Sequence, residues 1–169
     1  VLKDAIKTNP ENEKNYLNLV FVYSAEGMQE EAFKTAREMQ KNFPNSTVVH
    51  LALYKFYLES NNTKEALESM KTVLKAEEID PDSKFKVLND FLNFVTANPG
   101  YDNELQEVTA LFAEMENSPG VYKKLGEYFL VKDQKEKALS YFELGIKQDL
   151  DNFDLLQKTL LLQIDLKKF

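Results

Sequence analysis

The sequence repeats itself with a period of about 34 residues, a length typical of chains that stack copies of one supersecondary unit. Three segments share one spacing of apolar and aromatic residues: Tyr16-Leu19-Val20-Tyr23, His50-Leu53-Tyr54-Tyr57 and Tyr122-Leu125-Gly126-Phe129. In each case an alanine follows nine residues after the last aromatic residue, at Ala32, Ala66 and Ala138. This period restricts the folds that the chain can adopt.

The spacing inside each unit predicts two helices joined by a turn. Apolar residues at i, i+3, i+4 and i+7 form one stripe on the first helix, and the alanine begins the stripe on the second helix. Because alanine is small, the two helices can approach closely there. Gly27, Asn61-Asn62 and Asp133-Gln134 occupy the turn, where Gly and Asn suit a left-handed backbone. Thr63 is the predicted N-cap of the helix that follows.

Composition favours an all-α chain. Of the 169 residues 43% are apolar, which is enough for a substantial core, and the five Gly and five Pro are few for an all-β fold. The net charge of -7, with a single arginine at Arg37, argues against a nucleic-acid partner. The absence of Cys excludes disulfides and thiolate metal sites, and the sequence contains no membrane-spanning segment.

The pattern resembles the tetratricopeptide repeat (TPR) family, whose 34-residue unit carries W-x2-L-G-x2-Y, then A-x3-F, then a late proline. The best match is YKKLGEYF followed by Ala138 and Phe142, while Pro10 and Pro44 stand one period apart. The resemblance implies an all-α fold: a right-handed α-solenoid, or superhelix, of stacked helix-turn-helix units. It covers the whole chain, closely in three units and loosely in one.

The period divides the chain into about four complete repeats with a partial repeat at each end. The predicted ranges are 1–12, 13–46, 47–80, 81–118, 119–152 and 153–169. The unit at 81–118 has four extra residues, and we expect its helices at about 83–97 and 102–117. Two registers are open for its first helix, Val87-Leu88-Phe91 or Leu88-Phe91-Leu92-Val95, and Val108, Phe112 and Met115 are the expected core of its second.

The two ends of the sequence fall inside predicted repeats. Residues 1–12 correspond to the end of a second helix, and residues 153–169 correspond to a first helix. Solenoids normally finish with polar capping units, and Leu2, Ala5 and Ile6 are apolar. We therefore expect an excised middle segment of a longer protein, with an apolar face near Leu2 and possible self-association through open ends.

We find no constellation of residues that predicts catalysis. His50 is the only histidine, so a metal site would have to consist of carboxylates, and a packed structural role is the better interpretation. Neighbouring carboxylates such as Glu30-Glu31 point about 100° apart on a helix and do not converge. Phosphate-binding loops and nucleophile motifs are missing from the sequence. We predict a non-enzymatic chain without a cofactor or metal.

The resemblance implies a concave groove lined by the first helices of successive units. Carried over to this sequence, the groove positions are Lys14, Leu17, Phe21, Leu51, Lys55, Leu58, Lys123, Glu127 and Leu130. Exposed apolar residues in a cluster suggest a binding surface. The alternative is that Leu17, Phe21, Leu51 and Leu58 are buried against neighbouring helices.

The predicted function is a protein–protein interaction module that binds a peptide or partner protein in this groove. In one subclass of TPR proteins, Lys, Asn and Arg clamp the carboxylate terminus of chaperones. The corresponding positions here hold Leu17, Phe21 and Ala52, which disfavours such a clamp. The alternative is an architectural or regulatory arm of a larger protein, an enzyme or an envelope-associated protein, whose active part lies outside this segment.

Overall fold

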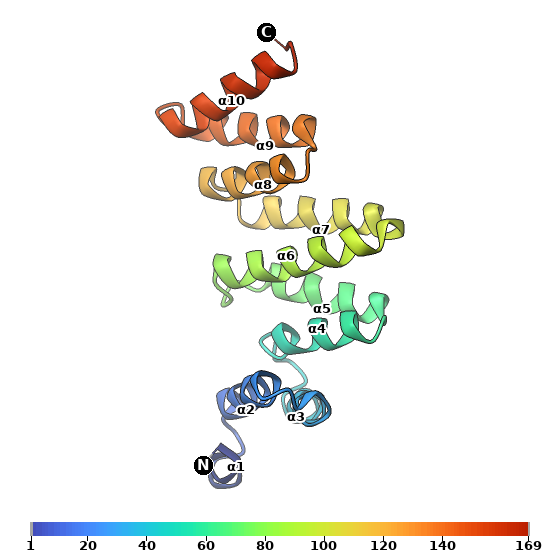
Figure 1. Ribbon diagram of the computed structural model, residues 1–169. Helices are drawn as coiled ribbons and strands as arrows, with labels where there is room; N and C mark the ends of the chain where they lie inside the picture. The colour runs from blue at the N-terminus through green and yellow to red at the C-terminus, as the bar shows by residue number, and fades with distance from the viewer. Residues whose placement is uncertain (1, 169) are drawn as a thin grey trace. The chain divides into compact units, whose positions relative to one another are not determined.

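The computed structural model describes residues 2–168, and within that range it is helical without a β-strand (Figure 1). The elements are α1 (Leu2–Thr8), α2 (Glu13–Ala25), α3 (Gln29–Asn42), α4 (His50–Glu59), α5 (Thr63–Lys75), α6 (Pro81–Ala97), the 3-10 helix η1 (Pro99–Tyr101), α7 (Asp102–Met115), α8 (Pro119–Val131), α9 (Lys135–Gln148) and α10 (Phe153–Asp165). No helix in the described range has both the length and the hydrophobicity needed to cross a bilayer. The all-α fold class is confirmed.

The chain forms two compact units, residues 1–112 and 113–169, and the division falls within α7. In the first unit α2 pairs with α3 and α4 with α5, while α1 packs against α2. In the second unit α8 pairs with α9, and α10 packs against α9. The helix-turn-helix pairs that the period predicts are therefore present in both units.

The turn inside each regular pair has the same backbone geometry. Gly27, Asn61 and Asp133 have φ of 76°, 58° and 57°, the left-handed conformation expected at these positions. The next backbone N–H donates to the carbonyl of the aromatic residue five positions earlier, as in Met28 to Tyr23 (N···O 2.8 Å). These bonds satisfy carbonyls that a helix end leaves free. Lys167, one period after Asp133, repeats the turn after α10 with φ 56°.

The three predicted alanines are completely buried. Ala32, Ala66 and Ala138 have no exposed surface. The α8–α9 pair also has a glycine on its first helix: a Cβ added at Gly126 would lie 2.3 Å from Cε1 of Phe142. Glycine is required there by the approach of the aromatic ring and not by its backbone angles.

One predicted cap is wrong. Thr63 is the first residue of α5 and Asn62 takes the N-cap position without a side-chain hydrogen bond. The left-handed residue Asn61 already reverses the chain, so Thr63 turns inward, where it is 8% exposed. Side-chain caps occur instead at several first helices: the side chain of Asn12 accepts from the N–H of Lys14, and that of Asn152 accepts from the N–H of Leu155.

The irregular third pair consists of α6 and α7, close to the predicted ranges, with η1 as the enlarged turn. α6 buries Val87, Leu88, Phe91, Leu92 and Val95, so both proposed registers are in part correct. A 17-residue helix that is covered on two sides buries a wide stripe. Val108 and Phe112 are buried as expected, but Met115 is 41% exposed, because it is the last residue of α7 and the helix ends there.

Candidate functional site: a groove on the first helices

A hollow of about 280 Å³ lies between α2, α4 and α6 in the first unit. Its lining includes Phe21 and Ser24 from α2, Leu51, Tyr54 and Lys55 from α4, and Lys86 and Asp90 from α6. Three of the predicted groove residues, Phe21, Leu51 and Lys55, therefore meet at one place. The helices that form it are first helices, which stack on one another because α4 contacts both α2 and α6.

The floor of this groove is fixed by a hydrogen bond between two first helices. The hydroxyl of Tyr54 on α4 donates to Oδ2 of Asp90 on α6 over 2.8 Å. Burial, together with the negative charge of Asp90, raises the pKa of Tyr54 far above its ordinary value, so the phenol stays protonated and remains a donor. One carboxylate oxygen of Asp90 therefore accepts from Tyr54, and the negatively charged side chain still lines the hollow.

The rim combines an exposed aromatic ring with two lysines. Phe21 is 49% exposed, and Leu51 is half-buried beside it. Lys55 and Lys86 are exposed, and neither forms an ion pair within the part of the chain that the structure describes. A half-exposed phenylalanine next to unpaired ammonium groups is a surface that can take an apolar group and an anion together.

Three further predicted residues lie elsewhere on these helices. Lys14 is exposed in the first turn of α2, and the half-buried Leu17 packs against the core of the first unit; neither lines the hollow. For Leu58 the prediction of an exposed groove residue is wrong, because its side chain is only 7% exposed. Leu58 follows Tyr54 by four residues and therefore shares the side of α4 that faces α6.

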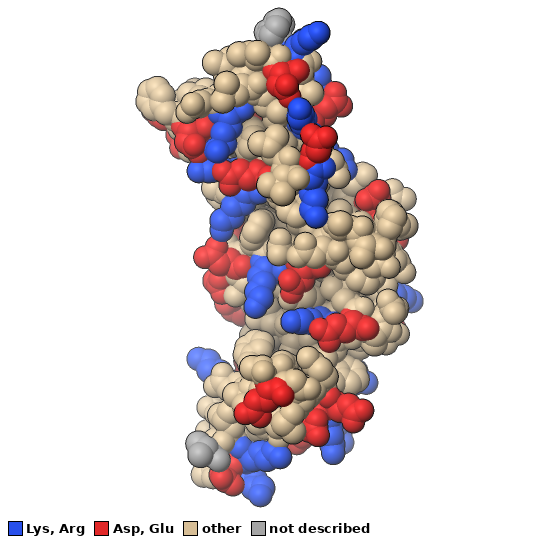
Figure 2. Space-filling view, viewed as in Figure 1, with Lys and Arg blue, Asp and Glu red and all other residues tan. Residues whose placement is uncertain are grey.

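In the second unit, Lys123 and Glu127 on α8 form ion pairs with α10. The Nζ of Lys123 lies 2.6 Å from Oδ2 of Asp154, and the Nζ of Lys158 lies 3.3 Å from Oε1 of Glu127. The hydrogen bond to Lys123 lowers the pKa of Asp154, while the same bond raises the pKa of Lys123. Leu130 is 40% exposed at the end of α8. Opposite charges also alternate on the molecular face in Figure 2.

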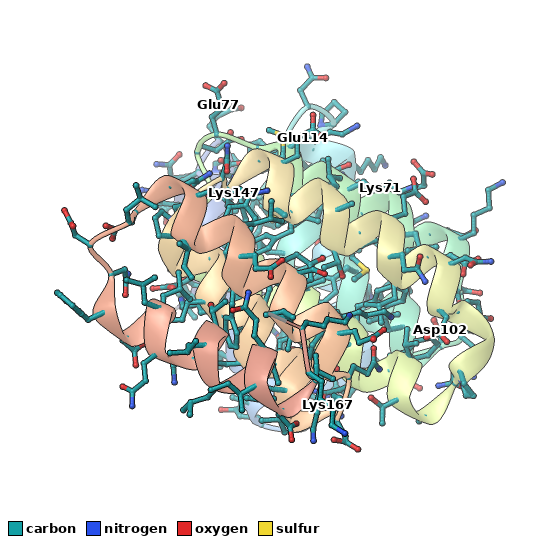
Figure 3. The ribbon with its side chains drawn as sticks, turned by 90° about the horizontal axis from the view of Figure 1, so that it is seen from above. Lys71, Glu77, Asp102, Glu114, Lys147 and Lys167 are labelled. Carbon is teal, nitrogen blue, oxygen red and sulfur yellow. The ribbon has the colours of Figure 1, made fainter. Side chains whose placement is uncertain are left out.

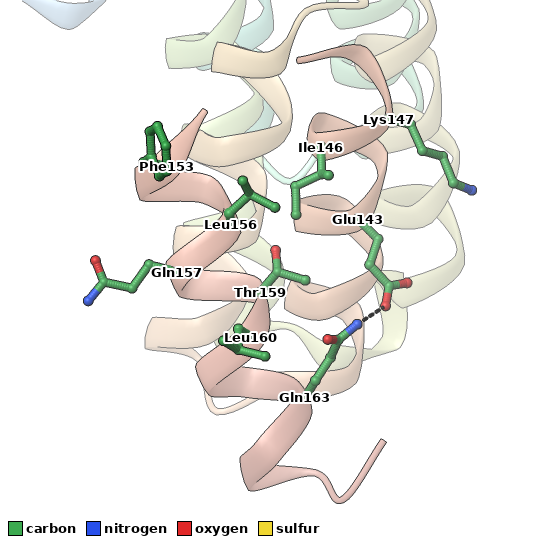
Figure 4. A pocket seen from close by; sticks show the side chains of 9 residues that line it. All are labelled: Glu143, Ile146, Lys147, Phe153, Leu156, Gln157, Thr159, Leu160 and Gln163. Atoms are coloured by element: carbon green, nitrogen blue, oxygen red, sulfur yellow. Dashed lines mark hydrogen bonds between the residues drawn. The ribbon is translucent and has the colours of Figure 1, made fainter. Parts of the chain in front are cut away.

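A second hollow, of about 640 Å³, lies between α9 and α10 (Figure 4), and none of the groove positions predicted from the sequence belongs to it. Its lining is Glu143, Ile146, Lys147, Phe153, Leu156, Gln157, Thr159, Leu160 and Gln163. The signal that could have revealed it is the period, because Leu156, Thr159, Leu160 and Gln163 stand one period after the stripe of α8.

His50 lies in the packed position that the sequence suggests. It is half-buried, and its Nδ1 lies 3.0 Å from the Oγ of Ser69 on α5. Burial lowers the pKa of His50, so the neutral ring is favoured. Among the described residues, no three His, Asp or Glu side chains form a group that could hold a metal ion.

Comparison with solved structures identifies similar folds. PilF of Pseudomonas aeruginosa matches over 94% of this chain and 71% of its own, with 20% identity and a TM-score of 0.54. YrrB, a TPR protein with an unusual peptide-binding site, matches over 99% of this chain and 84% of its own, with 16% identity and a TM-score of 0.56. No family model and no curated protein matches the sequence. The paired helices, their shared turn and these likenesses show that the chain has the tetratricopeptide repeat fold.

Proposed function

We propose that the protein is a non-enzymatic interaction scaffold that binds a segment of a partner protein in the groove of α2, α4 and α6. The observation that carries this proposal is Phe21, a large aromatic side chain that is 49% exposed inside a hollow. Leaving such a ring in water costs free energy that a partner's apolar group would recover. The peptide-binding site of the similarly folded YrrB supports the same class of function.

The chemistry of the groove defines the segment that it would take. An apolar side chain would pack on Phe21 and Leu51, and a neighbouring Asp or Glu would reach Lys55 and Lys86. A longer segment would extend along α2 towards Lys14. Lys123, Glu127 and Leu130 belong to the second unit, where they would form a separate contact surface on α8.

The experiment is selection of random peptides on the immobilised protein, followed by fluorescence anisotropy with the selected peptides. We expect enrichment of sequences that place an apolar residue beside an acidic one. Phe21→Glu should weaken binding about tenfold or more, since it removes the burial of an aromatic ring and adds repulsion.

The matched control is Val22→Glu, because Val22 is also exposed, at 40%, and does not line the hollow. It should bind with unchanged affinity. Selection of the same peptides by the Phe21→Glu protein, with equal affinity, would remove this groove from the proposed function.

A further inference from the structure

The groove on α2, α4 and α6 contains charges of both signs. Among the described residues that line the hollow, Lys55 and Lys86 are basic, Asp90 alone is acidic, and Ser24 and Gln29 are polar and neutral. The lining thus carries two positive charges and one negative charge. An occupant with a single net negative charge would balance them.

The two lysines of the groove differ from a lysine that pairs within the same unit. The Nζ of Lys71 on α5 (Figure 3) lies 2.8 Å from Oε1 of Glu107 on α7. Lys55 and Lys86 have no such partner within residues 2–168. Both ammonium groups are therefore available to an acidic residue of a partner segment.

The position of Asp90 in the hollow is fixed from α4. Its Oδ2 accepts the hydrogen bond from the hydroxyl of Tyr54 over 2.8 Å, and Tyr54 is only 3% exposed. A carboxylate can accept about four hydrogen bonds. Within residues 2–168, Asp90 accepts no other hydrogen bond and forms no ion pair. The half-buried carboxylate therefore combines a defined position with unused acceptor capacity.

A partner segment that packs on Phe21 and Leu51 would also cover Asp90, since all three residues line one hollow of about 280 Å³. Covering removes water from the carboxylate, and a charged acceptor that loses water without gaining a donor costs free energy. A hydrogen bond donated by the segment would offset this cost, because bonds to a charged acceptor are stronger than bonds between neutral groups. The segment therefore needs a donor where it meets Asp90.

The neighbouring lysines indicate that this donor is neutral. Lys86 precedes Asp90 by four residues and so lies one turn away on the same face of α6, and Lys55 lines the same hollow. A Lys or Arg of the segment at this point would be repelled by these ammonium groups, and an Asp or Glu would be repelled by Asp90 itself. The amide or hydroxyl group of Asn, Gln, Ser or Thr avoids both kinds of repulsion.

We propose that Asp90 determines the charge selectivity of this groove: it accepts a hydrogen bond from a neutral Asn, Gln, Ser or Thr of the partner segment and excludes a second acidic residue. The segment thus combines one apolar residue, one acidic residue for Lys55 and Lys86, and one neutral donor. This inference rests on the proposed function, because it describes the segment that the groove binds.

The experiment uses the tightest-binding peptide from the selection on the full chain. Each residue within two positions of its acidic residue is replaced in turn by Gln, Met, Glu or Lys, and binding is measured by fluorescence anisotropy. Gln, Met and Glu have similar lengths, but only Gln donates a hydrogen bond and only Glu is charged. At the position that meets Asp90, the Gln peptide should bind about tenfold more tightly than the Glu peptide, and more tightly than the Met and Lys peptides.

Asp90→Asn in the protein tests the residue itself. The side-chain carbonyl of Asn can still accept the hydrogen bond from Tyr54, while the negative charge is lost. The Gln and Glu peptides should then bind with about equal affinity, mainly because the Glu peptide binds more tightly. The matched control is Glu59→Gln, which removes one negative charge from the exposed end of α4, outside the hollow. This control should keep the preference for Gln.

Equal binding of the Gln, Met and Glu peptides by the unsubstituted protein at every position would overturn the inference, whether or not the Asn variant folds. Tighter binding of a Lys peptide would refute the neutral donor, and an Asp90→Asn protein that keeps the preference for Gln would refute the role of Asp90. In each of these cases the proposed function stands if Phe21→Glu weakens binding. Unchanged binding by the Phe21→Glu protein would instead remove the groove, and this inference with it.

Discussion

At the scale of single residues, the paired helices are matched by size. Gly126 lies against the ring of Phe142, whereas Ala32, Ala66 and Ala138 supply the small side chain on the second helix. Each regular pair therefore has a buried alanine on its second helix, and the α8–α9 pair has a glycine on its first helix as well. The period predicts a small residue between paired helices. The ring of Phe142 determines that position 126 cannot hold a residue larger than glycine without a shift.

Gly126→Ala should destabilise the protein by about 1–3 kcal/mol, because the added Cβ would lie 2.3 Å from the ring of Phe142. Urea denaturation measures this change. The control is Gly120→Ala, where a Cβ meets no atom within 4 Å and stability should be equal or slightly higher. Equal stability of both variants would contradict the close approach.

The free energy of unfolding should decrease as the pH falls through the titration range of His50. Burial lowers the pKa of His50 below its ordinary value of 6.5, so the unfolded chain binds a proton more readily than the folded protein. The contribution of His50 to stability is therefore complete above pH 6.5 and declines as the pH falls towards the lower pKa of the folded state. Urea midpoints between pH 7.5 and 5.5 measure it.

His50→Gln keeps a hydrogen-bonding side chain beside Ser69 and removes the titrating ring. This variant should have a flatter pH dependence over the same range. Because His50 is the only histidine, an unchanged slope would assign the pH dependence to other groups.

At the scale of helices and turns, the left-handed residue that ends each regular first helix is the most repeatable feature. Gly27, Asn61, Asp133 and Lys167 have φ between 56° and 76°. Only the glycine adopts this conformation without steric cost. The hydrogen bonds of the turn are the same in all four cases, so the tertiary packing holds the other residues in place.

Asn61→Gly should raise stability by up to about 1 kcal/mol, because it relieves the left-handed strain, and Asn61→Val should lower it by about 1–2 kcal/mol. Thermal unfolding followed by circular dichroism measures both variants. A higher melting temperature for the valine variant would be incompatible with the turn described here.

The turn of the third pair differs from the others, and we expect it to open more easily. Asn98 has φ of -134°, and the 3-10 helix Pro99–Tyr101 replaces the left-handed turn. Pro99 and Gly100 are exposed. Amide hydrogen exchange should be faster at residues 98–102 than within α6 and α8. Protection equal to that of the helices would show that the longer turn is as rigid as the short ones.

At the scale of the whole molecule, the chain forms two compact units. Repeat folds gain stability mainly from nearest neighbours. Gly126→Ala should therefore reduce hydrogen-exchange protection in α8, α9 and α10 and leave α2 and α3 unchanged. A uniform loss of protection across both units would show that the chain unfolds as one cooperative block.

The sequence by itself determined the helix pairs, the turn residues Gly27, Asn61 and Asp133, and the small residues between paired helices. These features depend on contacts within one period, so they leave a regular pattern along the chain. The tertiary structure alone decided that Leu58 is buried and that Tyr54 bonds to Asp90. The physical reason is that each of these features depends on contact with a neighbouring helix, and that helix lies a full period or more away in the sequence.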